Sequence, residues 1–203
     1  MTQRISFLNK NGRISGVFKR TEAVSVTLAV FLFIMLILAR PNFMDRVNIE
    51  SVQTSIAPYG IMAIGMMMLL ISGTFDLSVG STMSLGGLVS AISLTMGASP
   101  VVAILAGIFA GVLIGLINGV IVEIGKVNAL IATIGTMYIV RGISEIVLVG
   151  RGQAGYTDFP ESFNNLGRGQ LLGAYYMFWI LIALVIIFQF ILSYTKFGRK
   201  LYF

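Results

Sequence analysis

The sequence contains no cysteine and no histidine, and only 11% of its 203 residues are charged. Without cysteine, the chain can form no disulfide, no thiolate nucleophile and no cysteine-ligated metal site. Without histidine, it lacks the commonest general base and metal ligand of proteins. These two absences exclude most hydrolytic and metal-site templates. We therefore expect no catalytic residue, no metal site and no cofactor bound by this chain.

What the sequence has in abundance is apolar residues, which make up 57% of the chain. They fall in blocks of 16 to 23 residues that are separated by short polar joints. This pattern is typical of a protein that crosses a membrane several times. A soluble domain would need polar helix faces, which these blocks lack. The sequence therefore predicts an all-α integral membrane protein with about six transmembrane helices.

The predicted architecture has three parts: a basic tail (1–21), a helical bundle (22–193) and a short final segment (194–203). Within the bundle, the expected spans are residues 24–39, 54–72, 83–96, 101–122, 129–149 and 171–193. A polar joint at 41–53 precedes the second span, and we expect Pro58 in the first turns of that span, where a missing N–H costs least.

The distribution of lysine and arginine predicts the orientation of the spans. With the N-terminus in the cytoplasm and alternating spans, nine of these residues lie inside and four lie outside, including those of the long loop at 150–169. Cytoplasmic segments carry such an excess of basic residues. We therefore expect both termini in the cytoplasm, and we attribute the net charge of +6 to topology rather than to a nucleic-acid partner.

One polar stretch interrupts the apolar blocks where a membrane span is expected. Residues 72–81 contain a carboxylate, Asp76, between Gly73 and Gly80. Lipid cannot hydrogen-bond a broken backbone, so a helix break near residues 72–82 must lie against protein or a water-filled cavity. Asp76 or Ser78 could simply cap the following helix. The same helix N-terminus could also face a permeation path, and the two interpretations are compatible.

Two further patterns concern helix contacts. Small residues recur every fourth position from Ala103 through Gly107, Gly111, Gly115 and Gly119. This spacing predicts a groove in which another helix packs closely, either from the same chain or from a second copy.

Arg141 and Glu145 lie four residues apart on one face of the fifth span, so we expect an intramembrane ion pair. It could be a structural tie, a gate or a substrate contact.

A partial match to a phosphate-binding loop does not predict a nucleotide site. Gly119 and Gly125-Lys126 are separated by five residues, and Val127 stands where serine or threonine is needed. We therefore expect no ATP site in this chain, so that any ATP-driven work requires a partner.

Four segments resemble one family. Residues 73–81, Gly-Thr-Phe-Asp-Leu-Ser-Val-Gly-Ser, are similar to the GxxDLSVGS segment of permease subunits of monosaccharide ABC importers of the ribose/xylose/galactose type. Residues 128–142, 159–163 and 195–202 also resemble that family. The resemblance implies a permease of the bacterial inner membrane. Its partners would be a second permease subunit, a cytoplasmic subunit that uses ATP and a periplasmic sugar-binding protein.

The resemblance implies that the chain moves a monosaccharide inward by alternating access. Sugars are neutral and polar, so the path should offer hydroxyls and amides. The residues expected on the substrate path are Ser72, Thr74, Phe75, Asp76, Ser78, Ser81 and Asn118.

Family members continue beyond the segment that faces the ATPase, which here comprises Lys196, Phe197, Gly198 and Arg199, whereas this sequence stops at Phe203. We therefore expect a truncated permease. The alternatives are a non-transporting remnant or an autonomous channel.

Overall fold

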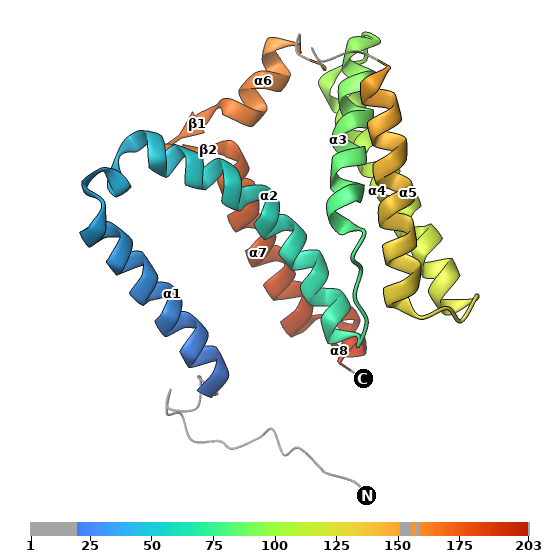
Figure 1. Ribbon diagram of the computed structural model, residues 1–203, viewed down its shortest axis with the longest axis horizontal. Helices are drawn as coiled ribbons and strands as arrows, with labels where there is room; N and C mark the ends of the chain where they lie inside the picture. The colour runs from blue at the N-terminus through green and yellow to red at the C-terminus, as the bar shows by residue number, and fades with distance from the viewer. Residues whose placement is uncertain (1–19, 151–155, 157–158, 203) are drawn as a thin grey trace, which may run out of the picture. The chain divides into compact units, whose positions relative to one another are not determined.

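The computed structural model describes residues 20–150, 156 and 159–202 (Figure 1). The predicted basic tail lies outside the described residues up to residue 19. The chain forms two compact units, residues 1–49 and 50–203, which we describe separately. The elements are α1 (Arg20–Ala39), η1 (Pro41–Met44), α2 (Arg46–Ile71), α3 (Val79–Thr95), α4 (Pro100–Glu123), α5 (Ala129–Val149), α6 (Glu161–Arg168), β1 (Gln170–Leu171), β2 (Ala174–Tyr175), α7 (Tyr176–Tyr194) and α8 (Lys196–Leu201).

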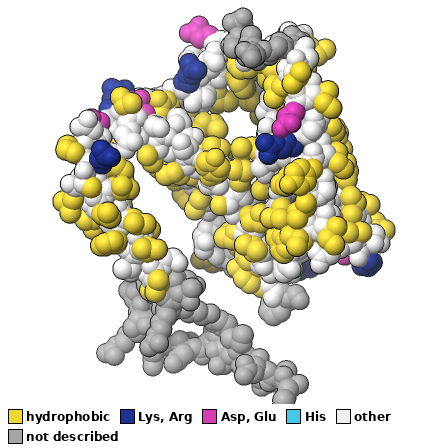
Figure 2. Space-filling view, in the orientation of Figure 1, with side chains coloured by type: hydrophobic (Ala, Val, Ile, Leu, Met, Phe, Trp, Pro, Cys, Tyr) yellow, Lys and Arg dark blue, Asp and Glu magenta, His cyan; other side chains and the backbone are white. Residues whose placement is uncertain are grey.

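The prediction of a helical membrane protein is confirmed. Among the described residues, the four helices α2, α4, α5 and α7 are long and apolar enough to cross a membrane. Two shorter apolar helices cover Ala23–Ala39 and Val79–Thr95. These six helices correspond to the six apolar blocks of the sequence. Large hydrophobic side chains cover much of their surface, as Figure 2 shows, because these surfaces are suited to lipid rather than water.

In the first unit, α1 is followed by the single 3-10 turn η1, which Pro41 opens. The Phe33 and Phe43 rings meet edge to face, with centroids 5.6 Å apart. The Asn48 side chain donates a hydrogen bond of 2.7 Å to the Phe43 carbonyl. These contacts fix the turn that joins α1 to the beginning of α2.

Helix α2 begins earlier than the sequence predicts. The prediction of a polar joint is therefore wrong for residues 46–53, which are helical. Pro58 consequently lies in the helix interior rather than in its first turns. Two polar side chains of this stretch, both in the second unit, have partners within that unit. Glu50 accepts a hydrogen bond from Tyr175, and Gln53 accepts one from the Tyr175 backbone N–H.

The predicted helix break is confirmed, although it is shorter than expected. Gly73 ends α2 with a φ of +79°. The Thr74 N–H bonds to the Leu69 carbonyl and the Gly73 N–H to the Leu70 carbonyl, which is a Schellman motif. Helix α3 begins at Val79, so Gly80 and Ser81 lie in its first turn and only residues 72–78 are non-helical.

Helices α3, α4 and α5 pack side by side (Figure 1). Gly107 of α4 packs against Gly86 and Ser90 of α3, and a Cβ added to Gly107 would lie 2.6 Å from the Gly86 carbonyl oxygen and would also meet the Ser90 hydroxyl oxygen. Ser90 donates a hydrogen bond of 2.9 Å across the same contact to the Ala103 carbonyl. The helix starts agree with the sequence, because Ser99 precedes Pro100 as the N-cap of α4, and Asn128 caps α5.

The predicted sixth span starts later than expected, at Tyr176, because residues 170–175 form a hairpin. Leu172 and Gly173 at its tip both have positive φ, at 54° and 83°, which is typical of a type I′ turn. Helix α7 lies beside α2, and a Cβ added to Gly60 would meet the Leu181 side chain at 2.7 Å.

Candidate functional site

A network of polar side chains ties the helix break to α4 and α5. The Asp76 Oδ1 atom accepts hydrogen bonds from the Ser78 backbone N–H at 2.7 Å and from the Ser78 hydroxyl at 2.6 Å. The Asn118 amide on α4 donates to Asp76 Oδ2 at 3.1 Å and to Ser78 Oγ at 2.9 Å. The Thr136 hydroxyl on α5 donates to Asn118 Oδ1 at 2.7 Å. We call Asp76, Ser78, Asn118 and Thr136 the polar network.

Three of the four residues of the polar network are buried among apolar helices, and Asp76 is partly exposed. Ser78 is 0% exposed, Asn118 is 5% exposed and Thr136 is 8% exposed. Every buried side-chain nitrogen and oxygen of the described residues has a hydrogen-bond partner. A fully satisfied buried network holds its members in one arrangement, because each lost bond would leave an unpaired polar group at low dielectric. The break is therefore fixed in place by three separate elements.

Ser78 occupies the N-cap position of α3, but its side chain accepts no hydrogen bond from a helix N–H. Its hydroxyl donates to Asp76 instead. The two side chains that the sequence assigns to capping thus bond to each other and to α4. The main role of these two side chains is therefore to connect the break to α4, rather than to cap α3.

A cavity of about 330 Å³ lies on one side of the polar network. Four residues expected on the substrate path line it, namely Thr74, Phe75, Asp76 and Asn118. Gly115 and Gly119 line it as well, and a Cβ added to either glycine would meet no heavy atom within 4 Å. We call this space the break cavity. Because glycine has no side chain, these two positions leave space that a larger residue would fill.

A second cavity, of about 430 Å³, lies between α3 and the C-terminal half of α5. Its polar lining consists of Ser81, Ser84, Arg141, Ser144 and Glu145. The Ser81 side chain is the only member of the expected substrate path in this lining. We call this space the ion-pair cavity.

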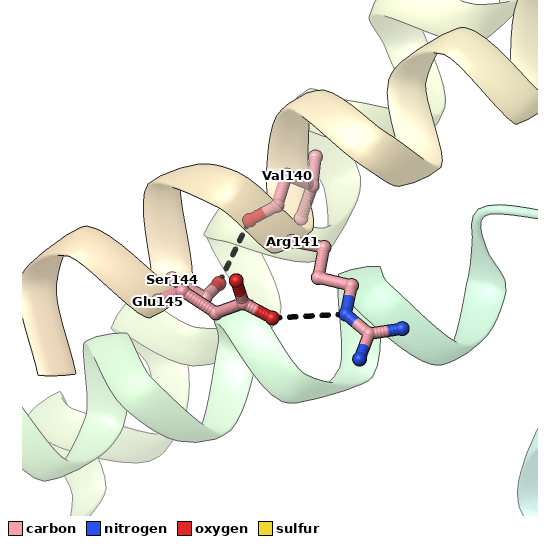
Figure 3. A network of polar contacts seen from close by, with 4 residues as sticks. All are labelled: Val140, Arg141, Ser144 and Glu145. Atoms are coloured by element: carbon pink, nitrogen blue, oxygen red, sulfur yellow. Dashed lines mark hydrogen bonds and ion pairs between the residues drawn. The ribbon is translucent and has the colours of Figure 1, made fainter.

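The ion pair expected from the sequence forms in the structure. Arg141 Nε and Glu145 Oε1 are 3.0 Å apart, on one face of α5 (Figure 3). Both side chains line the ion-pair cavity and are largely exposed, at 70% and 62%. The neighbouring Ser144 is buried, and its hydroxyl donates to the Val140 carbonyl at 2.9 Å.

The other expected residues lie apart from the polar network. The Ser72 hydroxyl donates back to the Leu69 carbonyl at 2.8 Å, and the residue lines neither cavity. Gly111 is in ordinary contact with the Thr82 methyl group, at 3.8 Å from an added Cβ. The segment expected to face an ATPase forms α8, in which Gly198 is buried against the Leu192 backbone.

The sequence interpretation missed Thr133 and Thr136, which are buried on the inner face of α5. A signal for them exists, because Thr133, Thr136, Val140 and Ser144 recur at intervals of three or four residues. That spacing places them on one helix face. A face that carries hydroxyls within an apolar helix indicates the side that turns away from lipid.

Among the described residues, no group of acidic side chains could hold a metal ion.

Residues 48–203 match the family described as the permease component of branched-chain amino acid transport systems. The chain is 39% identical over 175 residues to the L-arabinose transport system permease protein AraH of Escherichia coli strain K12, covering 85% of this chain and 52% of that protein. It is 35% identical over 189 residues to the L-arabinose ABC transporter permease protein AraH of Azospirillum brasilense, covering 93% and 54%.

The ribose import permease protein RbsC of Haemophilus influenzae is 32% identical over 182 residues, covering 89% of this chain and 56% of that protein. The chain thus spans about half the length of the curated relatives it matches. No solved structure matches the chain.

Proposed function

This chain belongs to the family of transport-system permease components, and we propose on that basis that it is a membrane-spanning component of a monosaccharide importer. The relatives named for arabinose and ribose transport support a sugar rather than an amino acid as the substrate. The single observation that carries the proposal is the polar network, which lies between two cavities within a bundle of apolar helices.

The chemistry of the polar network suits a neutral polar solute. It presents hydroxyl, amide and carboxylate groups, which exchange hydrogen bonds readily with sugar hydroxyls. A solute in the break cavity can contact Thr74, Asp76 and Asn118. We propose that alternating access opens the break cavity and the ion-pair cavity in turn, while the polar network separates them.

The energy for this cycle would come from partners. We propose that a cytoplasmic subunit hydrolyses ATP and contacts α8 at Lys196, Phe197 and Arg199. A periplasmic sugar-binding protein would dock outside over α6 and the hairpin, and a second permease subunit would complete the path. The excess of lysine and arginine on the side of the N-terminus supports an orientation in the inner membrane with both ends in the cytoplasm.

Reconstitution tests this proposal. The chain is placed in proteoliposomes with an ATPase subunit and a binding protein of an arabinose or ribose importer. The expected result is ATP-dependent accumulation of L-arabinose or D-ribose but not of leucine. Sugar leak without any partner would indicate a channel. No uptake under conditions where a full-length relative works would indicate a non-transporting chain and would contradict the proposal.

Asp76→Ala tests the role of the break within that assay. We expect it to reduce sugar uptake at least about ten-fold, because Ser78 and Asn118 lose the partner that holds the break. Membrane insertion should fall much less. Ser72→Ala is the matched control, since the Ser72 hydroxyl bonds only within α2. Equal losses of uptake and insertion would mean that Asp76 is only a structural residue.

A further inference from the structure

We infer that the ion-pair cavity is a binding subsite for a monosaccharide, in which Arg141 and Glu145 contact the sugar hydroxyls directly. This inference rests on the importer function proposed above and adds a second position on the path, separate from the break cavity. The volume of about 430 Å³ lies within the range of small-molecule sites, which typically offer a few convergent polar groups.

Two serine hydroxyls of the lining use their protons in bonds to the protein, so they are placed to accept hydrogen bonds from a ligand. Ser81 donates its proton to the Ser78 carbonyl at 2.8 Å, and Ser144 donates its proton to the Val140 carbonyl at 2.9 Å. A serine oxygen has two lone pairs, so both oxygens keep acceptor capacity while their donors are used. The two side chains can therefore receive O–H donors from a ligand without giving up their own bonds.

The ion pair does not use all the hydrogen-bonding groups of its two side chains. Its contact joins Arg141 Nε to one Glu145 oxygen, rather than pairing the guanidinium and carboxylate in the bidentate manner. In Figure 3 the two terminal nitrogens of Arg141 point away from Glu145. The pair thus presents N–H donors and a carboxylate acceptor side by side. Adjacent sugar hydroxyls, each both donor and acceptor, match this arrangement.

The charge of the cavity favours a neutral ligand. Arg141 and Glu145 cancel, and no other ionisable group lines this cavity. Charged residues within a span are costly unless they face a bundle interior or a water-filled space, and there they mark substrate pathways. A lone arginine would select an anion, whereas this pair offers a neutral polar solute hydrogen bonds to both partners.

The ion-pair cavity lies beside the polar network on the proposed path. Ser81 lies one helical turn after Ser78, and Met137 directly follows Thr136. The ion-pair cavity therefore adjoins the polar network from the side opposite Thr133, which lines the break cavity. The C-terminal half of α5 leads into the loop expected outside, so in the orientation proposed above a solute moving inward reaches the ion pair before the polar network.

The absence of cysteine makes a direct experiment possible. Ser84→Cys places one thiol in the cavity lining, and Lys126→Cys places one on an exposed turn as the control. Each variant is reconstituted alone in nanodiscs and treated with a charged thiol reagent, with and without L-arabinose or D-ribose. We expect sugar to slow the labelling of Ser84→Cys at least about three-fold and to leave Lys126→Cys unchanged.

Two variants of the pair distinguish a sugar contact from a structural tie. In the Ser84→Cys chain, Glu145→Gln should raise the sugar concentration needed for protection about ten- to a hundred-fold, the effect of losing hydrogen bonds to a charged group. The exchanged pair, Arg141→Glu with Glu145→Arg, keeps an ion pair and so preserves the fold of α5. We expect it to lose protection as well, because its donors and acceptor have exchanged places.

The outcomes separate this inference from the importer proposal. Protection that survives the exchanged pair would overturn the direct contact and leave a structural tie. No protection in a chain that supports ATP-dependent uptake with its partners would overturn the subsite while the importer function stands. Protection in a chain that supports no uptake would uphold the subsite and contradict the importer function.

Discussion

The α3–α4–α5 group and the α2–α7 pair are built differently, although both consist of apolar helices. The group is joined in its interior by the polar network and by the backbone contact between Gly107 and Gly86. The pair has hydrogen bonds at one end, where Glu50 and Gln53 of α2 bind the hairpin that precedes α7, and an apolar contact of Gly60 with Leu181 farther along. Most of the buried residues of the described chain belong to the group.

This difference shows where specificity comes from when the helix surfaces are uniformly apolar. Lipid tails are as apolar as leucine side chains, so hydrophobic contact alone does not select one helix partner over another. In the group, the selecting contacts are hydrogen bonds and a close glycine approach. In the pair, this role falls to one terminal clamp and to the contact of Gly60 with the flexible Leu181 side chain. We therefore expect the group to resist perturbation as one body.

The largest expected effect comes from filling the glycine contact. Gly107→Leu should lower the free energy of unfolding by about 3 kcal/mol, because the side chain must displace the Gly86 backbone as well as the Ser90 hydroxyl. Unfolding in mixed micelles with increasing denaturing detergent measures this. Gly115→Leu is the control, since an added Cβ there meets nothing within 4 Å, and it should leave stability unchanged. Equal losses from the two variants would contradict the predicted contact.

The second largest effect should follow from breaking the polar network. Asn118→Leu removes the side chain that joins Ser78 to Thr136, and we expect a loss of about 2 kcal/mol. Thr133→Val is the matched control, because the Thr133 hydroxyl bonds only to the Ala129 carbonyl of its own helix. If the control costs as much as Asn118→Leu in the same micelle titration, the network does not join the helices.

A smaller effect is expected at the clamp of the other pair. Glu50→Gln leaves one oxygen for the two donors, Tyr175 and Gln170, and should cost about 1 kcal/mol. Amide hydrogen exchange should accelerate several-fold in the hairpin and remain unchanged in α4. Faster exchange in both places would mean that the two regions are not independent.

The smallest effect is expected at the exposed pair of Glu123 and Lys126. Their charged atoms are 3.7 Å apart, and both side chains are about four-fifths exposed. Glu123→Gln should change the free energy of unfolding by less than about 0.5 kcal/mol, because solvent and salt screen such pairs. The same micelle titration at low and high salt checks this. A larger loss of stability would contradict the prediction, because it would mean that solvent does not screen the pair.

The helix boundaries of the group were predictable because local signals mark them. Ser99-Pro100 and Asn128 define the starts of α4 and α5, and Gly97 follows the end of α3. The start of α2 and the hairpin were not predictable. Glu50 and Gln53 have as partners Tyr175 and Gln170, more than a hundred residues away, and a single sequence does not show such pairings.

The residues of the candidate site were partly predictable. Asp76, Ser78 and Asn118 are the polar residues that an apolar context singles out, and the structure brings them together. Arg141 and Glu145 follow from their spacing on one helix. Thr136 was missed, because its meeting with Asn118 depends on how α5 is rotated about its axis against α4. That rotation results from packing, which no local pattern records.

The two glycine turns at either end of α3 have a consequence for the membrane around it. Between Gly73 and Gly97, α3 comprises only 17 residues, Val79–Thr95, which is about 25 Å of helix at a rise of about 1.5 Å per residue. The hydrocarbon core of a bilayer is about 30 Å thick. When the Gly97 turn lies at one interface, the other end of α3 stops short of the opposite one. This hydrophobic mismatch holds Asp76 below the lipid headgroups, at a depth that changes with bilayer thickness.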